Sequence, residues 1–337
     1  MIYYLNNIFI RRGNQMYYCV VNPSAKSGTG IRLWKNFEKK FQERGLEYRV
    51  VYTNGPGHAL KTVKKLTECV DTAELPLKLV VLGGDGTLNE VISGIRDFDQ
   101  VLLGYLPVGS SNDFARDLSL PSDPEKIMEQ ILDGKEVRRM DIGRLHYNSE
   151  THTLSRLHDQ TKSDTRMFDV SAGIGFDAAV CEQALASGTK NFLNRIGMGK
   201  LTYGAIAVHQ LLSADKIACD IELDGVQTLH LDHFLFAAVM VHKYEGGGFC
   251  FSPNADASDG LFDLCVIGDM SVPKMFMALP FAYVGKHYGI RGVYHYTARH
   301  VRIHTMLPLW VHTDGEVSMK SDCISLDCLP HRLILMM

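Results

Sequence analysis

The sequence predicts a doubly wound α/β domain followed by a largely antiparallel β domain. Over residues 17–106, short apolar runs alternate with amphipathic helical segments, an order typical of a parallel sheet covered by helices. Near residue 137 the helical spacing gives way to strict alternation, as in Ile217, Cys219 and Ile221. A chain of 337 residues is long enough to bury two hydrophobic cores.

The elements of the first domain follow from their apolar spacing. The run 17–21 is the first strand, and the polar loop 24–30 leads into a helix that buries Trp34 and Phe37 and stops at Gly45. The expected strands cover 17–21, 47–53, 78–82 and 101–106, and the expected helices cover 31–44, 57–70 and 87–95. The loops at the carboxyl ends of these strands share one edge, where sheets of this kind bind ligands.

The stretch Gly83–Glu90 lies where a buried strand ends and a helix begins. Thr87 and Glu90 have capping-box spacing, so the helix is expected to begin at Thr87. The glycines would let free backbone N–H groups approach a phosphate at the helix N-terminus. The carboxylate of Asp85 would repel that phosphate unless Mg²⁺ or ordered water lies between them. The junction therefore predicts a nucleotide triphosphate with its metal, and the alternative is an ordinary tight turn with a capping threonine.

A third polar loop, residues 107–116, follows the strand 101–106. It supplies hydroxyl, amide, carboxylate and guanidinium groups from Ser110, Ser111, Asn112, Asp113 and Arg116. Asn112 and Asp113 could instead cap the next helix. Because this loop joins the two others at one edge of the sheet, a binding site is the favoured interpretation.

The second domain is expected to consist mainly of strands. Asp224 and Gly225 predict a hairpin turn between two of them. The expected strands cover 217–223, 231–242, 261–267, 293–305 and 309–313, and the expected helices cover about 177–187, 191–213 and 271–287. The last strands, near 324–336, are expected to return to the first domain.

Composition and charge argue against several classes of function. The formal net charge of −3 is unlike that of a general nucleic-acid binder, which carries a basic excess. The eight cysteines form no CxxC pair, which favours a reducing cytoplasmic compartment. No apolar run is long enough to span a membrane, and residues 1–15 do not form a signal peptide. The histidines, including those at 287, 295, 300, 304 and 312, lack the geometry of a defined metal site.

Four motifs occur in order along the chain. They are Asn22–Gly28, Gly83–Glu90, Pro107–Arg116 and His312–Glu316. Together they resemble the diacylglycerol kinase catalytic family, specifically its soluble bacterial lipid-kinase branch. The resemblance begins at about Met16, where we expect translation to start, and continues to the C-terminus. It implies a nucleotide-binding domain at 16–140, a β-sandwich lipid-substrate domain at 141–316, and C-terminal strands at 317–337.

The resemblance also implies ATP and Mg²⁺ as cofactors and a role for each motif residue. Phosphoryl transfer needs a base for the acceptor hydroxyl, for which Asp314 is the candidate, with Glu316 beside it. Asp85 and Asp259 are the candidate metal ligands. The candidate nucleotide-binding residues are Asn22, Lys26, Gly83, Gly84, Asp85, Gly86, Thr87, Glu90, Gly109, Ser110, Asn112, Asp113, Arg116, Asp141 and Lys200.

We therefore expect a lipid kinase that phosphorylates the hydroxyl of a membrane lipid, with diacylglycerol as the first candidate and phosphatidic acid as its product. Such an enzyme would be cytoplasmic and would dock reversibly on the inner face of the membrane, and a homodimer is compatible with this interpretation. Two alternatives stay open. An NAD kinase would share the Gly83–Thr87 motif, and a non-catalytic regulator would bind nucleotide or lipid without turnover.

Overall fold

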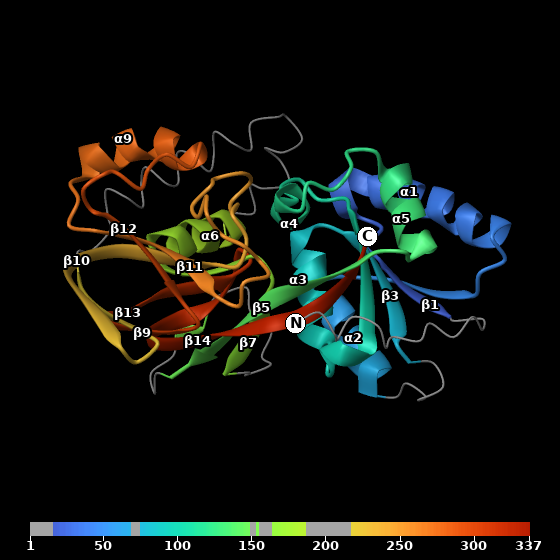
Figure 1. Cartoon of the computed structure of the whole chain (residues 1–337), viewed down its shortest axis with the longest axis horizontal. Coiled ribbons are helices and arrows are strands. Elements are labelled where there is room, and N and C mark those ends of the chain that lie inside the picture. Colours follow the sequence, from blue (N-terminus) through green and yellow to red (C-terminus); the bar gives the residue numbers. More distant parts are fainter. Residues whose placement is uncertain (1–15, 69–74, 149–152, 155–163, 187–216) are drawn as a thin grey trace, which may run out of the picture.

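The computed structural model describes residues 16–68, 75–148, 153–154, 164–186 and 217–337 (Figure 1). The α/β elements gather at one end of an elongated molecule and most of the later strands gather at the other. The long last strand, β14 (Glu316–Met336), runs from one end into the other.

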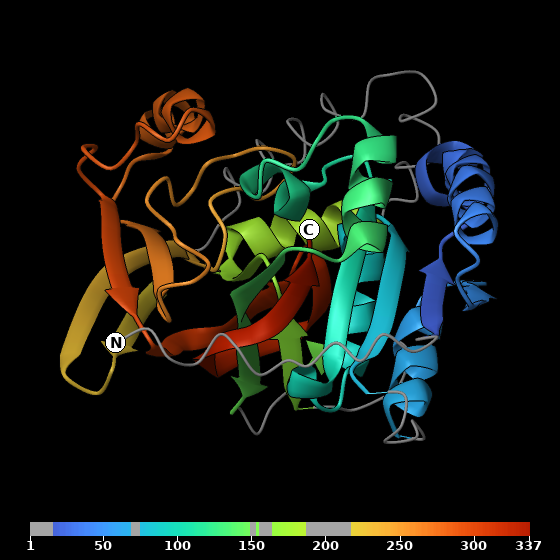
Figure 2. The same ribbon diagram turned by 45° about the vertical axis from the view of Figure 1, so that its right-hand side comes forward.

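The first domain contains a parallel sheet with helices on both faces, as the sequence predicts. The strands are β1 (Tyr17–Val21), β2 (Tyr48–Tyr52), β3 (Leu77–Gly83) and β4 (Val101–Pro107), in the order β2-β1-β3-β4. Helices α1 (Ala25–Glu43) and α5 (Pro124–Asp133) cover one face, and α2 (His58–Glu68) and α3 (Asp85–Gly94) cover the other (Figure 2). The predicted doubly wound architecture is thus confirmed.

Each face of this sheet has its own hydrophobic core. On the side of α1, Trp34 and Phe41 are fully buried, and the ring of Phe41 lies edge-on to Tyr17 with centroids 5.1 Å apart. On the other side, Val63 of α2 and Val91 of α3 are fully buried in a cluster that also contains residues of β3 and β4. The buried positions recur at helical spacing, which is the pattern that predicts these helices.

The predicted start of α1 is wrong. Of the polar segment 24–30, predicted as a loop, residues 25–30 form the first turns of α1, which begins at Ala25. The reason lies in Asn22, whose Oδ1 accepts the N–H of Ser24 at 3.1 Å and so turns the chain directly after β1. Lys26 and Gly28 keep positive φ angles of 45° and 89° within these turns, so the helix is irregular where the sequence is rich in small polar residues.

The expected capping box does not form. α3 begins at Asp85, two residues before the predicted start, because the N–H of Thr87 already bonds within the first turn at 2.9 Å. The carboxylate of Glu90 instead accepts the N–H groups of Gly57 and Ala59 at 2.7 and 3.0 Å. Glu90 therefore stabilises the N-terminus of the neighbouring helix α2.

The second domain is largely antiparallel, as predicted. Its strands are β5 (Val137–Tyr147), β7 (Thr165–Phe168), β8 (Ser171–Gly175), β9 (Ile217–Leu223), β10 (Gln227–Met240), β11 (Phe262–Gly268), β12 (Val293–Ala298), β13 (His300–Thr313) and β14, and the short β6 (Thr153–Leu154) pairs with β14. Asp224 and Gly225, both with positive φ, make the predicted turn between β9 and β10. Phe168 and Phe262 stack in the core at a centroid distance of 5.6 Å.

The predicted strand 293–305 is divided in the structure. The chain changes partners at Arg299, because β12 pairs with β11 whereas β13 pairs with β14 and β9. Asp224 Oδ1 holds this step by accepting the N–H groups of Arg299 and His300 at 2.9 and 2.7 Å. The run 309–313, predicted as a separate strand, is the end of β13.

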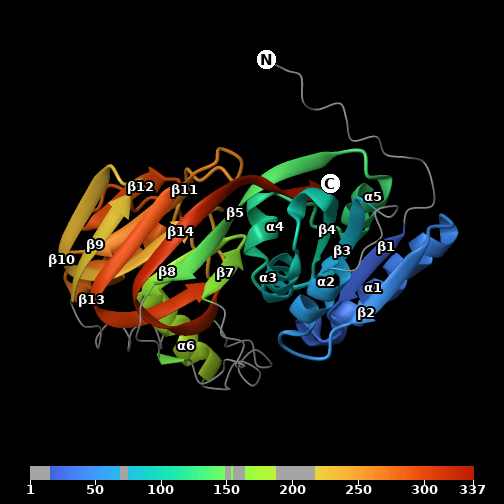
Figure 3. The ribbon, with the colours of Figure 1, turned by 90° about the horizontal axis from the view of Figure 1, so that it is seen from below.

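β14 joins the two domains through backbone hydrogen bonds. It pairs with β13 and β5 in antiparallel fashion, and Leu335 near its end pairs in parallel with Leu103 of β4 (Figure 3). The strands therefore form one continuous sheet, whose main path runs β12-β11-β10-β8-β13-β14-β4-β3-β1-β2.

Two further helices flank the second domain. α6 (Phe176–Ala186) follows β8, and α9 (Val272–Tyr283) lies at the upper left of Figure 1. α9 ends at Tyr283 rather than at residue 287, because Gly285 with φ 69° turns the chain. The helix predicted at 191–213 lies outside the described residues. Among the helices of the described ranges, none combines the length and apolarity needed to cross a membrane.

Candidate active site

The loops that follow β1, β3 and β4 meet at one place, as the sequence predicts. A Cβ on Gly84 would lie 3.0 Å from the Cα of Gly109, so only glycine lets these two backbones touch. Gly83 has no room for a side chain either, because its Cβ would lie 2.6 Å from that of Thr87. From the first loop, Asn22 Nδ2 donates to Thr87 Oγ1 at 3.1 Å. The N-terminus of α3 thus opens onto a surface formed by all three loops, which suits a phosphate group.

Asn112 shapes the third loop. Its backbone is left-handed with φ 50°, and its Oδ1 accepts the N–H of Gly109 at 2.8 Å. The side chain does not cap the short helix α4 (Asp113–Asp117), so the alternative of a plain helix cap is wrong for this residue. Ser110 is exposed on the same loop, where its hydroxyl is open to a ligand.

Asp85 and Asp113 are neighbouring, largely buried carboxylates. Asp85 Oδ2 accepts the N–H of Asp113 at 3.3 Å, and Asp113 Oδ2 accepts the N–H of Gly247, in the second domain, at 2.8 Å. Burial, followed by the charge of Asp113, raises the pKa of Asp85 to about 6. Burial also raises the pKa of Asp113.

These two carboxylates have the donor chemistry that Mg²⁺ prefers. Among the described residues, Asp85 Oδ1 and Asp113 Oδ1 are buried without a hydrogen-bond partner. Buried oxygens that accept no hydrogen bond are costly. Arg116 Nε approaches Asp113 Oδ1 only to the 3.5 Å of an ion pair, and a hard divalent cation would satisfy both oxygens. The residues present therefore fit the cation that a kinase uses with ATP.

Arg116 is the cation beside this carboxylate pair. Its Nε lies 3.5 Å from Asp113 Oδ1, and its guanidinium lies 5.7 Å from the centre of the Tyr244 ring. The side chain is partly exposed, so it can contact an anionic ligand as well. Lys26 is exposed near the start of α1. Lys200, the other predicted cation, lies outside the described residues.

The turn between β13 and β14 approaches these loops from the second domain. Asp314 and Gly315 form it with φ angles of 49° and 77°, as expected for a tight hairpin. Four donors hold the carboxylate of Asp314: the N–H groups of Asp169, Val170 and Ser171 at 3.0, 2.9 and 2.9 Å, and Asn89 Nδ2 of α3 at 2.6 Å. Because both oxygens of Asp314 are engaged, this residue fixes the turn and ties it to the first domain.

Glu316, the other predicted catalytic carboxylate, has the opposite surroundings. It is exposed at the start of β14, whereas Asp314 is half-buried. Its Oε1 lies so close to Gly86 that a Cβ on that glycine would be 3.3 Å away. Of the two predicted carboxylates, Glu316 is the one that reaches the N-terminus of α3 with a carboxylate that is not hydrogen-bonded or ion-paired to any of the described residues.

A further carboxyl group, Asp169, lies behind this turn and was not predicted. It is 1% exposed, and neither of its side-chain oxygens has a hydrogen-bond partner among the described residues. Burial, followed by the charge of Asp314, raises the pKa of Asp169 well above its usual value. Asp169 belongs to no sequence motif. Its neighbour in the fold, Asp314, is 145 positions away in the sequence, so residue spacing could not identify Asp169.

Asp141 and Asp259 lie together in the second domain. The buried carboxylate of Asp141 accepts the N–H groups of Gly260 and His331, each at 2.7 Å. Asp259 Oδ1 accepts the N–H of Leu261 at 2.9 Å. Asp141 therefore holds the loop around Asp259 to β14, and it is not among the residues that contact Asp85 and Asp113.

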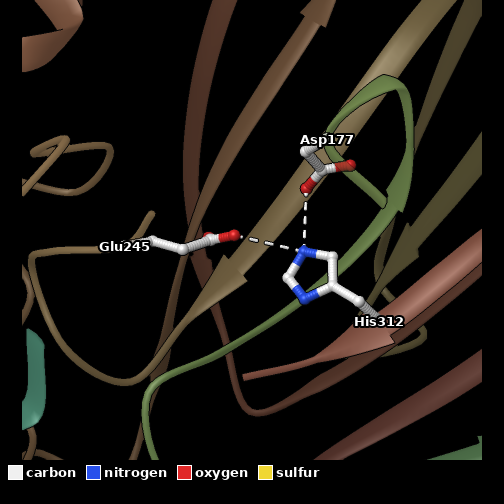
Figure 4. A group of neighbouring side chains, drawn as sticks. All are labelled: Asp177, Glu245 and His312. Atoms are coloured by element: carbon white, nitrogen blue, oxygen red, sulfur yellow. Dashed lines mark hydrogen bonds and ion pairs between the residues drawn. The ribbon is translucent and has the colours of Figure 1, made fainter. Parts of the chain in front are cut away.

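A buried histidine with two acidic partners lies next to the β13–β14 turn. His312 Nε2 is 3.2 Å from Asp177 Oδ2 and 3.1 Å from Glu245 Oε1 (Figure 4). Residue spacing gives no signal for this group, because its members come from three distant parts of the chain.

Comparison with known proteins matches both domains. Residues 16–145 match the family described as "Diacylglycerol kinase catalytic domain", and residues 170–337 match the "YegS C-terminal NAD kinase beta sandwich-like domain". The Bacillus subtilis protein named "Putative lipid kinase YtlR" is 30% identical over 304 residues, which cover 89% of this chain and 93% of that protein. The "Diacylglycerol kinase" of the same organism is 26% identical over 282 residues, 82% of each chain.

Solved structures share the whole fold. A crystal structure described as a diacylglycerol kinase from Bacillus anthracis matches 96% of both chains with a TM-score of 0.65 at 19% identity. The antiparallel domain is thus the β-sandwich that the resemblance implies. The chain belongs to the diacylglycerol kinase family of bacterial lipid kinases.

Proposed function

We propose that this protein is an ATP-dependent diacylglycerol kinase, which transfers the γ-phosphate of ATP to the lipid hydroxyl and forms phosphatidic acid. The observation that carries the proposal is the approach of Glu316 to Gly86, which sets a free carboxylate opposite the glycine motif. Phosphoryl transfer needs a phosphate site and a base within reach of each other. The choice of acceptor is supported by relatives that are named diacylglycerol kinase in Bacillus subtilis and Mycobacterium tuberculosis.

In this proposal the three loops of the first domain bind the nucleotide. The N–H groups at the start of α3 bind phosphate oxygens, and Asn22 keeps Thr87 in place beneath them. Arg116 supplies positive charge next to Asp113. Asp85 and Asp113 would hold Mg²⁺, which would offset the charge of the triphosphate.

We assign the role of general base to Glu316 rather than to Asp314. An exposed carboxylate can accept the proton of the lipid hydroxyl as the new P–O bond forms. Asp314 already accepts four hydrogen bonds, so it contributes by fixing the turn that carries Glu316. Both residues are thus important for turnover, but for different reasons.

The lipid is proposed to reach the site from a bilayer on which α9 docks. α9 has no acidic residue in its first turn, and Met277, Phe281 and Val284, at helical spacing on and just after it, are 70%, 49% and 58% exposed. Tyr283, at its end, packs edge-on against Phe249 with centroids 5.4 Å apart. Phe249 closes the glycine-containing turn that contacts Asp113, so the apolar surface continues toward the proposed nucleotide site.

The proposal is tested by incubating the purified protein with radiolabelled ATP, Mg²⁺ and mixed micelles that contain diacylglycerol. We expect a labelled lipid that migrates with phosphatidic acid and is absent when EDTA replaces Mg²⁺. A parallel reaction with a total lipid extract tests for other acceptors, and one with NAD tests the kinase that shares the glycine motif. Labelled NADP without labelled lipid, or ATP binding without turnover on any acceptor, would refute the proposal.

A further inference from the structure

His312, Asp177 and Glu245, which we call the His312 cluster, join three segments of the second domain (Figure 4). His312 lies near the end of β13, Asp177 in the first turn of α6, and Glu245 in the turn that follows β10. His312 is fully buried and Glu245 is 8% exposed. Gly173 is required beside them, because a Cβ there would lie 2.0 Å from Asp177 Oδ2 and 2.3 Å from His312 Nε2.

The distances in the His312 cluster suit either a metal ion or hydrogen bonds, and the other imidazole nitrogen distinguishes the two. A histidine that binds a metal through Nε2 donates its Nδ1–H to a partner. Here Nδ1 faces a donor, the N–H of Gly315 at 3.2 Å, so Nδ1 is an acceptor and the proton lies on Nε2. The arrangement therefore fits an Nε2–H shared between the carboxylates of Asp177 and Glu245 rather than a metal centre.

Through its two nitrogens, His312 connects two turns that both reach the proposed active site. On the Nδ1 side it holds Gly315, which lies between Asp314 and Glu316. On the Nε2 side it holds Glu245, which opens the turn 245–249. Gly247 of that turn donates its N–H to Asp113 Oδ2 at 2.8 Å.

We propose that His312 is a positioning residue that holds the Glu316 turn and the turn 245–249 in a fixed relation. It would thereby set the place of the base relative to Asp113 and the nucleotide. The role rests on the proposed function, but His312 itself touches no substrate in it. Because His312 is buried and bonded to both turns, replacing it should disturb both of them. Its hydrogen bond to Gly315 and its interaction with Glu245 can be removed separately.

Two substitutions separate the two links. In His312→Gln the side-chain amide can replace Nε2–H but leaves Gly315 without its acceptor. In His312→Asn the side-chain oxygen can replace Nδ1 but leaves the two carboxylates without their donor. We expect His312→Gln to lower kcat about tenfold with the KM for ATP nearly unchanged, because one buried hydrogen bond to the base turn is lost. We expect His312→Asn mainly to raise the KM for ATP, because the contact to Asp113 is loosened.

A second readout does not depend on activity. Hydrogen exchange should rise in the 312–317 peptide of His312→Gln and in the 243–249 peptide of His312→Asn. His304→Gln, on an exposed position of the same strand, is the matched control and should change neither. Because His312→Asn leaves two buried carboxylates unpaired, it is also made with Glu245→Gln, which removes one of those charges and keeps the fold testable.

Three outcomes would overturn the role of His312. They are kinetic constants of both variants within about twofold of wild type, exchange that rises uniformly across the chain in both variants, and a stoichiometric divalent metal in purified wild type that His312→Gln loses. A wild-type protein that phosphorylates no lipid would refute the proposed function. The exchange experiment would then still decide whether His312 couples the two turns.

Discussion

The carboxylate of Glu316 lies against the backbone of Gly86, although the two residues belong to different domains. A Cβ on Gly86 would be only 3.3 Å from Glu316 Oε1. One turn further along α3, Asn89 Nδ2 donates to Asp314 at 2.6 Å. The helix whose N-terminus forms the proposed nucleotide site therefore also holds the turn that carries the proposed base, so α3 would set the position of the base relative to the phosphates.

Glu316→Gln and Asp314→Asn are expected to fail in different ways. Glu316→Gln removes a free carboxylate, so kcat should fall by about 10²-fold or more with the KM for ATP and the thermal midpoint nearly unchanged. Asp314→Asn can keep one oxygen for the N–H groups of Val170 and Ser171, but its NH2 group then faces two donors that need an acceptor, the N–H of Asp169 and Asn89 Nδ2. This variant should lower the thermal midpoint as well as kcat, because buried N–H donors that lack an acceptor destabilise the folded protein.

The comparison of these two variants decides which carboxylate is the base. Turnover is measured with saturating ATP and diacylglycerol in micelles, and stability is measured by thermal unfolding of the same preparations. Near-wild-type turnover of Glu316→Gln would contradict its role as the base. A stable Asp314→Asn protein that loses turnover as completely as expected for Glu316→Gln would return that role to Asp314.

Apolar spacing predicts most of the fold because it reports which residues face a core. Trp34 and Val91 are buried as their spacing requires, and the alternation around Ile221 marks β9. The starts of helices are less predictable, because they depend on backbone hydrogen bonds that leave little trace in composition. Helix α5 was not predicted, although residues typical of helix ends flank it. Asp123 caps its start by accepting the N–H of Glu125, and Gly134 ends it in a left-handed conformation.

The residues of the candidate site also fall into a predictable and an unpredictable group. The glycines and Asp85 are recognisable from sequence because their chemistry is local to one strand–helix junction. The surroundings of Asp314 and the partners of His312 are not, because they are made by residues from other elements. Asp314 and Glu316 differ as candidate bases because Asp314 accepts hydrogen bonds from Val170 and Asn89, and no spacing of residues in the sequence predicts these bonds.

Gly84→Ala should weaken nucleotide binding. The new Cβ would lie 3.0 Å from the Cα of Gly109, and backbone on both sides must move to accommodate it. The loops would separate, so we expect the KM for ATP to rise about tenfold, whereas the lipid KM should stay within about twofold. Gly289→Ala is the control, because nothing lies within 4 Å of a Cβ at Gly289. Unchanged ATP affinity in Gly84→Ala, measured by calorimetry, would show that close contact of the two loops is not needed.

Asp85 should make the metal-free protein less stable at high pH. Folding raises the pKa of this carboxyl from 3.8 to about 6, so the folded protein binds the proton more tightly than the unfolded chain does. The contribution of protonated Asp85 to the free energy of unfolding is fully present below about pH 4 and is lost as the pH rises through about 6. In EDTA, Asp85→Asn should therefore be more stable than wild type at pH 8, by about 2 kcal/mol after allowance for solvent screening.

The pH dependence distinguishes this effect from a general one. The stability difference between Asp85→Asn and wild type should stay nearly constant from pH 8 to about 6.5 and then shrink as the pH falls from about 6 to 4, as measured by urea unfolding at each pH. Glu136→Gln, at an exposed position, serves as the control and should show no such trend. A difference that is the same at both ends of the range would mean that the Asp85 carboxylate is not the source.

Met277 and Phe281 should be needed for binding to vesicles but not for folding. Both are largely exposed on α9, at 70% and 49%, so replacing them by serine removes apolar surface without opening a cavity in the core. Insertion of such side chains into a bilayer surface contributes about 1–2 kcal/mol each, so the double variant should bind diacylglycerol-containing vesicles at least about tenfold more weakly in flotation. Val226→Ser removes an even more exposed apolar side chain, at 88% exposure, from the β9–β10 hairpin and should bind as wild type does. On a short-chain soluble diacylglycerol the α9 variant should retain its kcat, because the proposed catalytic carboxylates are untouched.

Equal vesicle binding of the α9 variant and wild type would exclude α9 as the docking face, and equal losses in both variants would point to a non-specific effect of surface apolarity.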